Sequence, residues 1–182
     1  NPCGGFLSCD YLRNAVNGIA TFNDLHVSIA CDDYILHAHS NSLSIAESNP
    51  FTIVAAAPSA LRFVTQPTAT DALALISAAV EVAIEDDFGN RVRTATHPVT
   101  LALDFNSGNG VLSGTLTRNA VNGLAVFDDL SLNSPADNYI LKATSGNLFS
   151  PTSIPFVIRR QIFFVRNPND ASSWPYQEGK LR

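Results

Sequence analysis

The hexapeptide Arg13-Asn14-Ala15-Val16-Asn17-Gly18 recurs unchanged as Arg118-Asn119-Ala120-Val121-Asn122-Gly123. The copies lie 105 positions apart, from 13 to 118, and the same offset relates Tyr34-Ile35-Leu36 to Tyr139-Ile140-Leu141. The correspondence holds without insertion or deletion as far as Pro50-Phe51 and Pro155-Phe156. Self-similarity at a fixed offset indicates a repeated structural unit.

A second, weaker echo relates residues 61–67 to residues 162–168, at an offset of 101. Together the two offsets predict three parts along the chain. The first, residues 1–54, is the C-terminal half of one repeat; the second, residues 61–158, is a complete repeat. Residues 159–182 are the start of a further repeat or a donated strand. Residues 55–60 contain a proline and form a short linker, for which we expect a semi-rigid joint.

Apolar residues alternate with polar ones along the complete repeat, as at Val80, Val82 and Ile84. This period is typical of half-buried strands, and turn sequences such as Asn122-Gly123 separate the runs. No segment has a convincing helical period with caps. We expect about seven strands near 61–67, 78–86, 98–105, 111–118, 123–132, 138–145 and 153–158, which predicts an all-β, two-sheet sandwich. Its expected core includes Val82, Leu101, Phe127, Tyr139 and Leu141.

A tyrosine opens the sixth expected strand in both copies, at Asp137-Asn138-Tyr139 and at Asp32-Asp33-Tyr34. This position suits a tyrosine corner, in which the hydroxyl donates to backbone at the turn before the strand. The alternative is a core tyrosine without a special hydrogen bond.

Several motifs in order resemble the bacterial immunoglobulin-like domains of invasin- and intimin-like adhesins and of large repeat proteins. They are Leu61-Arg62-Phe63-x-Thr65-Gln66-Pro67, Val80-x-Val82-x-Ile84-Glu85-Asp86-x-Phe88-Gly89-Asn90, Gly110-x-Leu112-Ser113-Gly114-Thr115 and Asn122-Gly123-x-Ala125-x-Phe127. The resemblance implies tandem immunoglobulin-like β-sandwich repeats, one complete and two partial at the ends. It also implies extracellular stalks, adhesion and scaffolding, without a shared catalytic site.

The composition limits the classes of partner. Hydrophobic residues make up 46% of the chain, which is enough for a packed core, and the formal net charge is -5. The largest basic cluster is the pair Arg159–Arg160, so we expect no nucleic-acid partner, because phosphate binding needs a concentrated basic face. No apolar run approaches the roughly 20 residues of a membrane-spanning helix, so we expect no membrane insertion. The opening, Asn1-Pro2-Cys3, has no signal-peptide pattern, and we interpret the chain as a processed or excised segment.

All three cysteines, Cys3, Cys9 and Cys31, lie near the start of the chain. Cys9 and Cys31 align with the small residues Gly114 and Ala136 of the second copy, so we interpret these two cysteines as a feature that only the first copy has. We predict a Cys9–Cys31 disulfide, with Cys3–Cys31 as the next pairing and buried reduced thiols as the alternative. We expect an oxidising, extracellular or cell-surface location, because the rest of the sequence resembles extracellular proteins and not because three cysteines demand it.

Catalytic signals are weak. No Gly-x-Ser-x-Gly elbow occurs, and we expect no catalytic residues, no cofactor and no enzymatic role. His37 and His39 could share a metal, but their alternation with Tyr34 and Leu36 favours a solvated face. A weak calcium site is the loop formed by Glu85, Asp86, Asp87 and Asn90, whose Asx residues also suit a turn without an ion.

The function that fits these features is a structural module of an extracellular repeat array or filament. Its partners would be adjacent repeats or neighbouring copies of the same protein. Head-to-tail assembly by strand complementation would donate Ile162, Phe163, Phe164 and Val165. The alternative is an adhesive module that binds carbohydrate on surface glycans, or a receptor, through Tyr11, Phe149, Trp174 and Tyr176.

Overall fold

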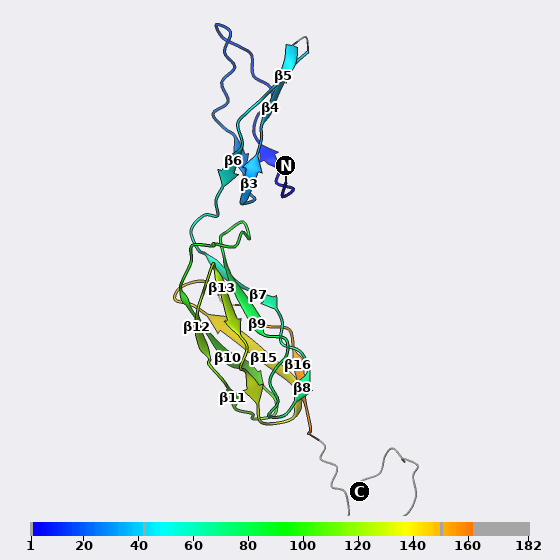
Figure 1. The fold of residues 1–182 in the computed structure, drawn as a ribbon. Helices are drawn as coiled ribbons and strands as arrows, with labels where there is room; N and C mark the ends of the chain where they lie inside the picture. Colours follow the sequence, from blue (N-terminus) through cyan, green and yellow to red (C-terminus); the bar gives the residue numbers. More distant parts are fainter. Residues whose placement is uncertain (1, 42, 150, 162–182) are drawn as a thin grey trace, which may run out of the picture.

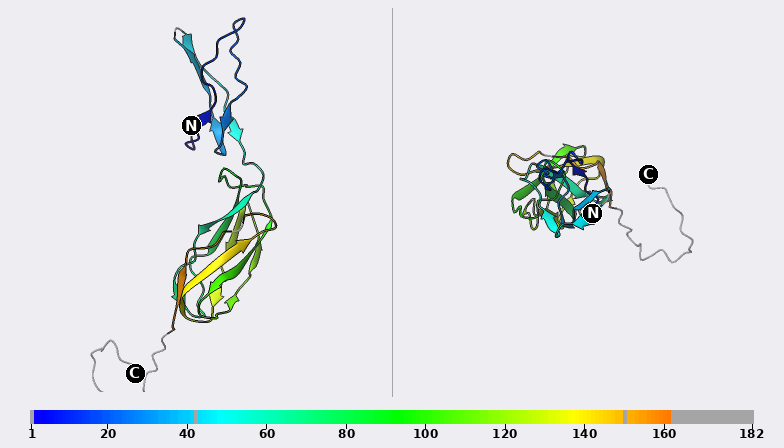
Figure 2. Two further views of the ribbon diagram at one scale, coloured as in Figure 1. Left: turned by 180° about the vertical axis from the view of Figure 1, so that it is seen from behind. Right: turned by 90° about the horizontal axis from the view of Figure 1, so that it is seen from above.

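The computed structural model describes residues 2–41, 43–149 and 151–161. Within these ranges all regular secondary structure is strand, and none of it is a helix that could cross a membrane. The described chain forms two parts placed end to end (Figures 1 and 2). We call residues 2–54 the first region and residues 60–161 the second region.

Two sheets form the body of the second region (Figure 1). The larger has the order β12-β10-β15-β16-β8, and the smaller has the order β13-β9-β7. β11 and β14 form a separate two-stranded sheet. The bounds are β7 Ala60–Thr65, β8 Thr70–Asp71, β9 Val80–Glu85, β10 Pro98–Asn106, β11 Leu112–Ser113, β12 Thr117–Asn119, β13 Leu124–Phe127, β14 Ser131–Leu132, β15 Ala136–Thr144 and β16 Phe156–Arg159.

The core of the second region lies between the two sheets, as the alternation of apolar residues predicts. Val82, Phe127, Tyr139 and Leu141 have no exposed surface, and Leu101 is 1% exposed. All five are the residues expected there, so the core prediction is confirmed. The all-β, sandwich-like architecture is confirmed with it.

Seven strands were predicted, whereas the described part of the second region has ten. The predicted strands 111–118 and 123–132 are each two short strands, and one strand was not predicted at all. β8 pairs in parallel with β16, through Ile158↔Thr70 and Arg159↔Asp71, and so adds an edge to the larger sheet. Its two residues are polar and lie in a segment without alternation. A strand this short is formed by its partner, not by its own pattern.

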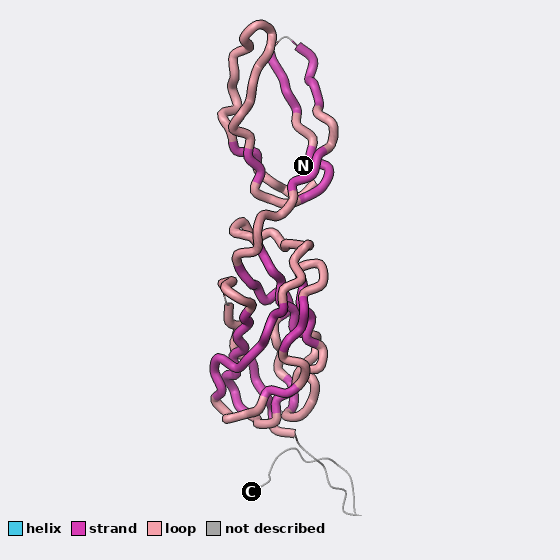
Figure 3. The backbone as a smooth tube through the Cα atoms, turned by 90° about the vertical axis from the view of Figure 1, so that its left-hand side faces the viewer, coloured by secondary structure: helices cyan, strands magenta, loops and turns pink. Residues whose placement is uncertain are grey.

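The first region repeats part of the strand pairing of the second region, and Figure 3 shows its strands at one end of the chain. The segments equivalent to β12 and β13 form no strand in the first region. Its strands are β1 Leu7–Ser8, β2 His26–Val27, β3 Cys31–Tyr34, β4 His37–Ser40, β5 Leu43–Glu47 and β6 Phe51–Ile53. The pair Leu7↔Val27 of β1 and β2 corresponds to Leu112↔Leu132 of β11 and β14. The pair Tyr34↔Phe51 of β3 and β6 corresponds to Tyr139↔Phe156 of β15 and β16. The repeat offset of the sequence is therefore also the offset of the strand register.

The same offset extends to side-chain hydrogen bonds. Ser48 accepts, at its hydroxyl oxygen, from the backbone N–H of Leu36 at 2.9 Å, and Ser153 accepts from that of Leu141 at 3.0 Å. The Asn-Gly turns also recur, with positive φ at Asn17-Gly18 and at Asn122-Gly123. Both copies therefore use the same local devices to end and connect their strands.

Candidate functional site: an open apolar face and a hydrogen-bonded joint

Equivalent residues of the two regions differ in burial. Phe127 is fully buried, whereas its counterpart Phe22 is 38% exposed. Leu130 is fully buried, whereas Leu25 is 42% exposed. Phe6 and Val16 are at positions exposed in both copies, as their counterparts Val111 and Val121 show. The other large exposed apolar residues of the first region are Tyr11, Leu12, Ile19, Phe22, Leu25, Ile35, Leu43, Ile45 and Val54. The face that forms a core in the second region is therefore open in the first.

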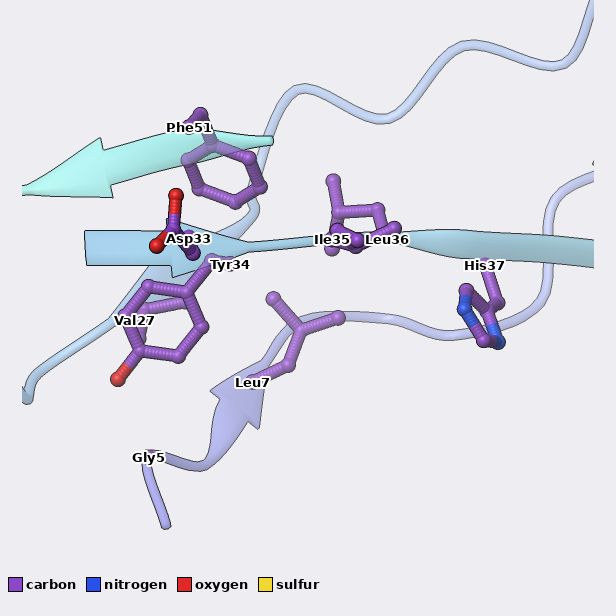
Figure 4. A pocket seen from close by; sticks show the side chains of 9 residues that line it. All are labelled: Gly5, Leu7, Val27, Asp33, Tyr34, Ile35, Leu36, His37 and Phe51. Carbon is purple, nitrogen blue, oxygen red and sulfur yellow. The ribbon is translucent and has the colours of Figure 1, made fainter. Parts of the chain in front are cut away.

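A pocket of about 430 Å³ lies on this face, and Figure 4 shows the side chains around it. Gly5, Leu7, Val27, Tyr34, Leu36 and Phe51 contribute to its lining. Their counterparts, at an offset of 105, are Gly110, Leu112, Leu132, Tyr139, Leu141 and Phe156. Of these, Leu132, Tyr139, Leu141 and Phe156 belong to the buried core, and Leu112 packs against it. The pocket is thus the part of the repeat core that the first region leaves unfilled.

One wall of the pocket is a tyrosine corner. The Tyr34 hydroxyl donates to the Ile29 carbonyl at 3.0 Å, and the Tyr139 hydroxyl donates to the Ser134 carbonyl at 2.8 Å. Both acceptors lie five positions upstream of their tyrosine. The close approach also requires glycine, because a Cβ atom on Gly5 would collide with the Tyr34 hydroxyl. The prediction of a tyrosine corner in both copies is confirmed.

A free strand edge borders the same face. In the second region β15 lies between β16 and β10. In the described part of the first region, β3 pairs with β6 and β4 pairs with β5, and the edge equivalent to the β10 side of β15 has no strand. Unpaired backbone N–H and C=O groups along such an edge accept a further strand.

The joint between the regions is held by Asn90. Its side-chain N–H donates to the Ser28 carbonyl at 2.7 Å, and its side-chain oxygen accepts from the Ala30 backbone N–H at 2.9 Å. Its second side-chain N–H donates to Asp86 at 3.0 Å. One amide thereby connects a loop of the second region to a turn of the first, about 60 positions earlier in the chain.

Asp86 positions Asn90 and also holds the connecting segment. This carboxylate is buried and accepts from the backbone N–H groups of Phe88 and Asn90, each at 2.9 Å. It accepts from the backbone N–H of Ala56 at 2.8 Å, within the segment that joins β6 to β7. Burial raises the pKa of Asp86, but the hydrogen bonds from the Asn90 side chain and from the three backbone N–H groups outweigh it, so the net pKa is lowered.

The four residues of the predicted calcium site do not form a common set of ligands in the structure. Glu85 pairs with Arg62 at 2.6 Å, Asp86 binds N–H groups, and Asp87 is exposed. Asn90 bridges the regions. Among the described residues no group of three or more His, Cys, Asp or Glu could hold a metal ion, so the geometry gives the calcium hypothesis no support.

The predicted linker, residues 55–60, is one residue too long, because Ala60 is the first residue of β7.

The disulfide prediction was wrong in its partner. The structure pairs Cys3 with Cys31, with a Cα–Cα distance of 6.2 Å, and leaves Cys9 as a free thiol. The reason is the register in which β1 pairs with β2. Leu7 lies opposite Val27, and continuing this antiparallel register four residues outward places Cys3 opposite Cys31. Cys9 follows the other end of β1, so the same register places it away from Cys31. The disulfide indicates an oxidising, non-cytoplasmic environment.

An arginine clamp in each copy escaped the sequence analysis. Arg13 binds Asp24 at 2.7 Å, and the equivalent Arg118 binds Asp128 at 2.8 Å and Asp129 at 3.2 Å. Hydrogen bonds from the Asp10 backbone and then from Arg13 lower the pKa of Asp24. Arg13 belongs to the quoted repeat motif, so the identity of the two motifs was the available signal.

The remaining candidates stay dispersed. His37 lies 3.3 Å from Glu47 and is exposed, as is His39. Tyr11 belongs to the first region and Phe149 to the second. The other two aromatic candidates, Trp174 and Tyr176, and the proposed assembly residues Ile162, Phe163, Phe164 and Val165 lie outside the described residues.

No protein-family model and no curated protein matches the chain. Among solved structures, it is similar to a glycosyl hydrolase family 2 member from Bacteroides cellulosilyticus, at 15% identity and a TM-score of 0.43. The match covers 70% of this chain and 17% of that one. The prediction that the chain has no enzymatic role is contradicted by this match to an enzyme. A match of this extent assigns no activity to the chain.

Proposed function

We propose that the chain is a structural module of an extracellular array of tandem immunoglobulin-like repeats, in which hydrogen-bonded joints hold successive repeats end to end. The 105-residue offset, which carries strand register and tyrosine corners alike, supports the repeat. In this division residues 1–54 are the second half of one repeat and residues 60–159, from the start of β7 to the end of β16, are a complete repeat. The residues after 159 begin another.

The observation that carries the proposal is the Asn90 bridge. A flexible linker would let neighbouring repeats rotate independently. Here the Asn90 amide uses both N–H groups and its oxygen, with two of these bonds to the first region. Asp86 ties the linker backbone to the same loop through Ala56. Together these hydrogen bonds restrict the angle between the two repeats. A spacer or stalk requires such a restricted angle, because it must hold its ends apart.

The test is whether the two regions tumble as one body. In the Asn90→Ala variant the Ser28 carbonyl and Ala30 N–H lose their partner, so we expect the NMR rotational correlation times of the two regions to separate. Asn138→Ala is the matched control, because Asn138 is an exposed asparagine of the second region away from the joint. Independent tumbling of the unmodified regions, or an unchanged Asn90→Ala variant, would refute the proposal.

The alternative, an adhesive module for glycans or a receptor, has no comparable observation. Its described aromatic residues, Tyr11 and Phe149, lie in different regions and form no shared platform.

A further inference from the structure

We propose that the open face of the first region is a docking site for two β-strands with the apolar pattern of β9 and β10, supplied as the first half of an immunoglobulin-like repeat. The proposal rests on the proposed function, because it names what such a repeat contributes to its neighbour half. The occupant is a polypeptide segment, since a free strand edge borders the apolar pocket and needs backbone partners as well as side chains.

The second region supplies the register for the β10-type strand. There Leu103 pairs with Leu141, Leu101 with Ala143 and Thr100 with Thr144. At an offset of 105 the acceptor positions are Leu36, Ala38 and His39. The incoming strand would therefore run antiparallel to β4 along its free edge.

Backbone direction on β4 agrees with this register. In β15 the N–H groups of Leu141 and Ala143 bind Ser153 and Pro151, so the alternate N–H groups of Lys142 and Thr144 face β10. In the first region Leu36 binds Ser48 in the same way. The N–H groups of His37 and His39 therefore face the edge that the occupant would fill.

The β9-type strand would pair with the segment of the first region that contains Ala20 and Phe22. In the second region Val82 pairs with Ala125, and Val80 pairs with Phe127. The counterparts of Ala125 and Phe127 are Ala20 and Phe22, in a segment that forms no strand in the first region. We expect this segment to become a strand when its partner arrives, and Phe22 to lose its exposure.

The β9 and β10 strands of a second copy are a poor source of the occupant. These strands fill the core of that copy's second region, where Val80, Val82 and Val99 have no exposed surface. Donating them would open one core to close another, with no net gain of buried apolar surface. The occupant must be a segment that is not already packed in such a core.

The experiment is a fusion that supplies the strands in register. Residues 58–106 are placed directly before Pro2 of the full chain, because the offset puts Asn106 where Asn1 stands. The control fusion carries Leu101→Asp and Leu103→Asp in the added segment only. Hydrogen exchange then measures the amides of Ala20, Phe22, His37 and His39 in the fusion, in its control and in the unmodified chain.

We expect these amides to exchange at least about tenfold more slowly in the fusion than in the unmodified chain, with the control fusion remaining fast. Equal exchange in fusion and unmodified chain would overturn the proposal, and so would equal protection in both fusions. Protection that increases with concentration of the unmodified chain would show that a second copy covers the face, which also overturns it. The Asn90→Ala experiment probes the joint independently, so the docking proposal can fail while the array proposal stands.

Discussion

Truncating the same phenylalanine in the two copies should have different costs. Phe127→Ala removes a fully buried ring and leaves a closed cavity, for which we expect a loss of about 3–5 kcal/mol in the second region. Phe22 is 38% exposed, so about 60% of the roughly 1.5–3 kcal/mol for burying a phenylalanine applies, and the open face leaves no closed cavity. We therefore expect Phe22→Ala to cost about 1–2 kcal/mol in the first region.

Urea denaturation of each variant, followed amide by amide by hydrogen exchange, assigns the loss to one region. With an m-value near 1.5 kcal/mol per molar urea, Phe127→Ala should lower the midpoint of the second region by about 2–3 M. The Phe22→Ala variant should shift the first region by about 1 M and leave the second unchanged. Equal costs for the two variants would mean that the two faces are equally covered, which would contradict an open face in the first region.

Four further predictions concern the first region, the joint and the tyrosine corner. Cys3→Ser opens a link between residues 28 positions apart and should destabilise the first region by about 3.5 kcal/mol, measured by denaturation; a loss in the second region instead would contradict the pairing. Peptide mapping of the unreduced chain should recover Cys9 alone as an alkylated thiol. Asp86 has a lowered pKa, so its contribution to stability is present above the ordinary aspartate pKa and is lost as pH falls through the lower folded value. Acid titration of Asp86→Asn should therefore show a weaker loss of stability below about pH 4 than the unmodified chain, and an identical titration would count against the assigned role. Tyr139→Phe removes one hydrogen bond to backbone and should lower the unfolding free energy of the second region by about 1 kcal/mol, with a neutral result excluding a structural tyrosine corner.

The sequence was sufficient where both copies carry the same signal. The alternation at Val82 and Leu101 and the recurrence of Tyr34 as Tyr139 predicted the core and the tyrosine corner. Both depend on local pattern, and the repeat supplied an internal check. β8 could not be found this way, because two polar residues have no period and gain a strand only from Ile158 and Arg159.

The site needed long-range information that the sequence does not hold. Cys31 could pair with either upstream cysteine until the register of β1 on β2 was known. The oxygen-rich loop at Asp86 and Asn90 suggested an ion, but its partners are backbone groups of Ser28 and Ala30, about 60 positions away. Every residue type has a backbone carbonyl, and all except proline have a backbone N–H, so no sequence pattern could predict that Asn90 binds these particular groups.

Native-state hydrogen exchange on the unmodified chain tests directly whether the face that is closed in the second region is open in the first, because it compares the two copies in one molecule. The amides of Lys142 and Thr144 face β10, whereas those of His37 and His39, at the same positions of the first copy, face the free edge. If the edge of the first region is free, exchange should be at least about a hundredfold slower at Lys142 and Thr144 than at His37 and His39, after correction for intrinsic rates. Equal protection of the two pairs would contradict a free edge, because the face of the first region would then be closed.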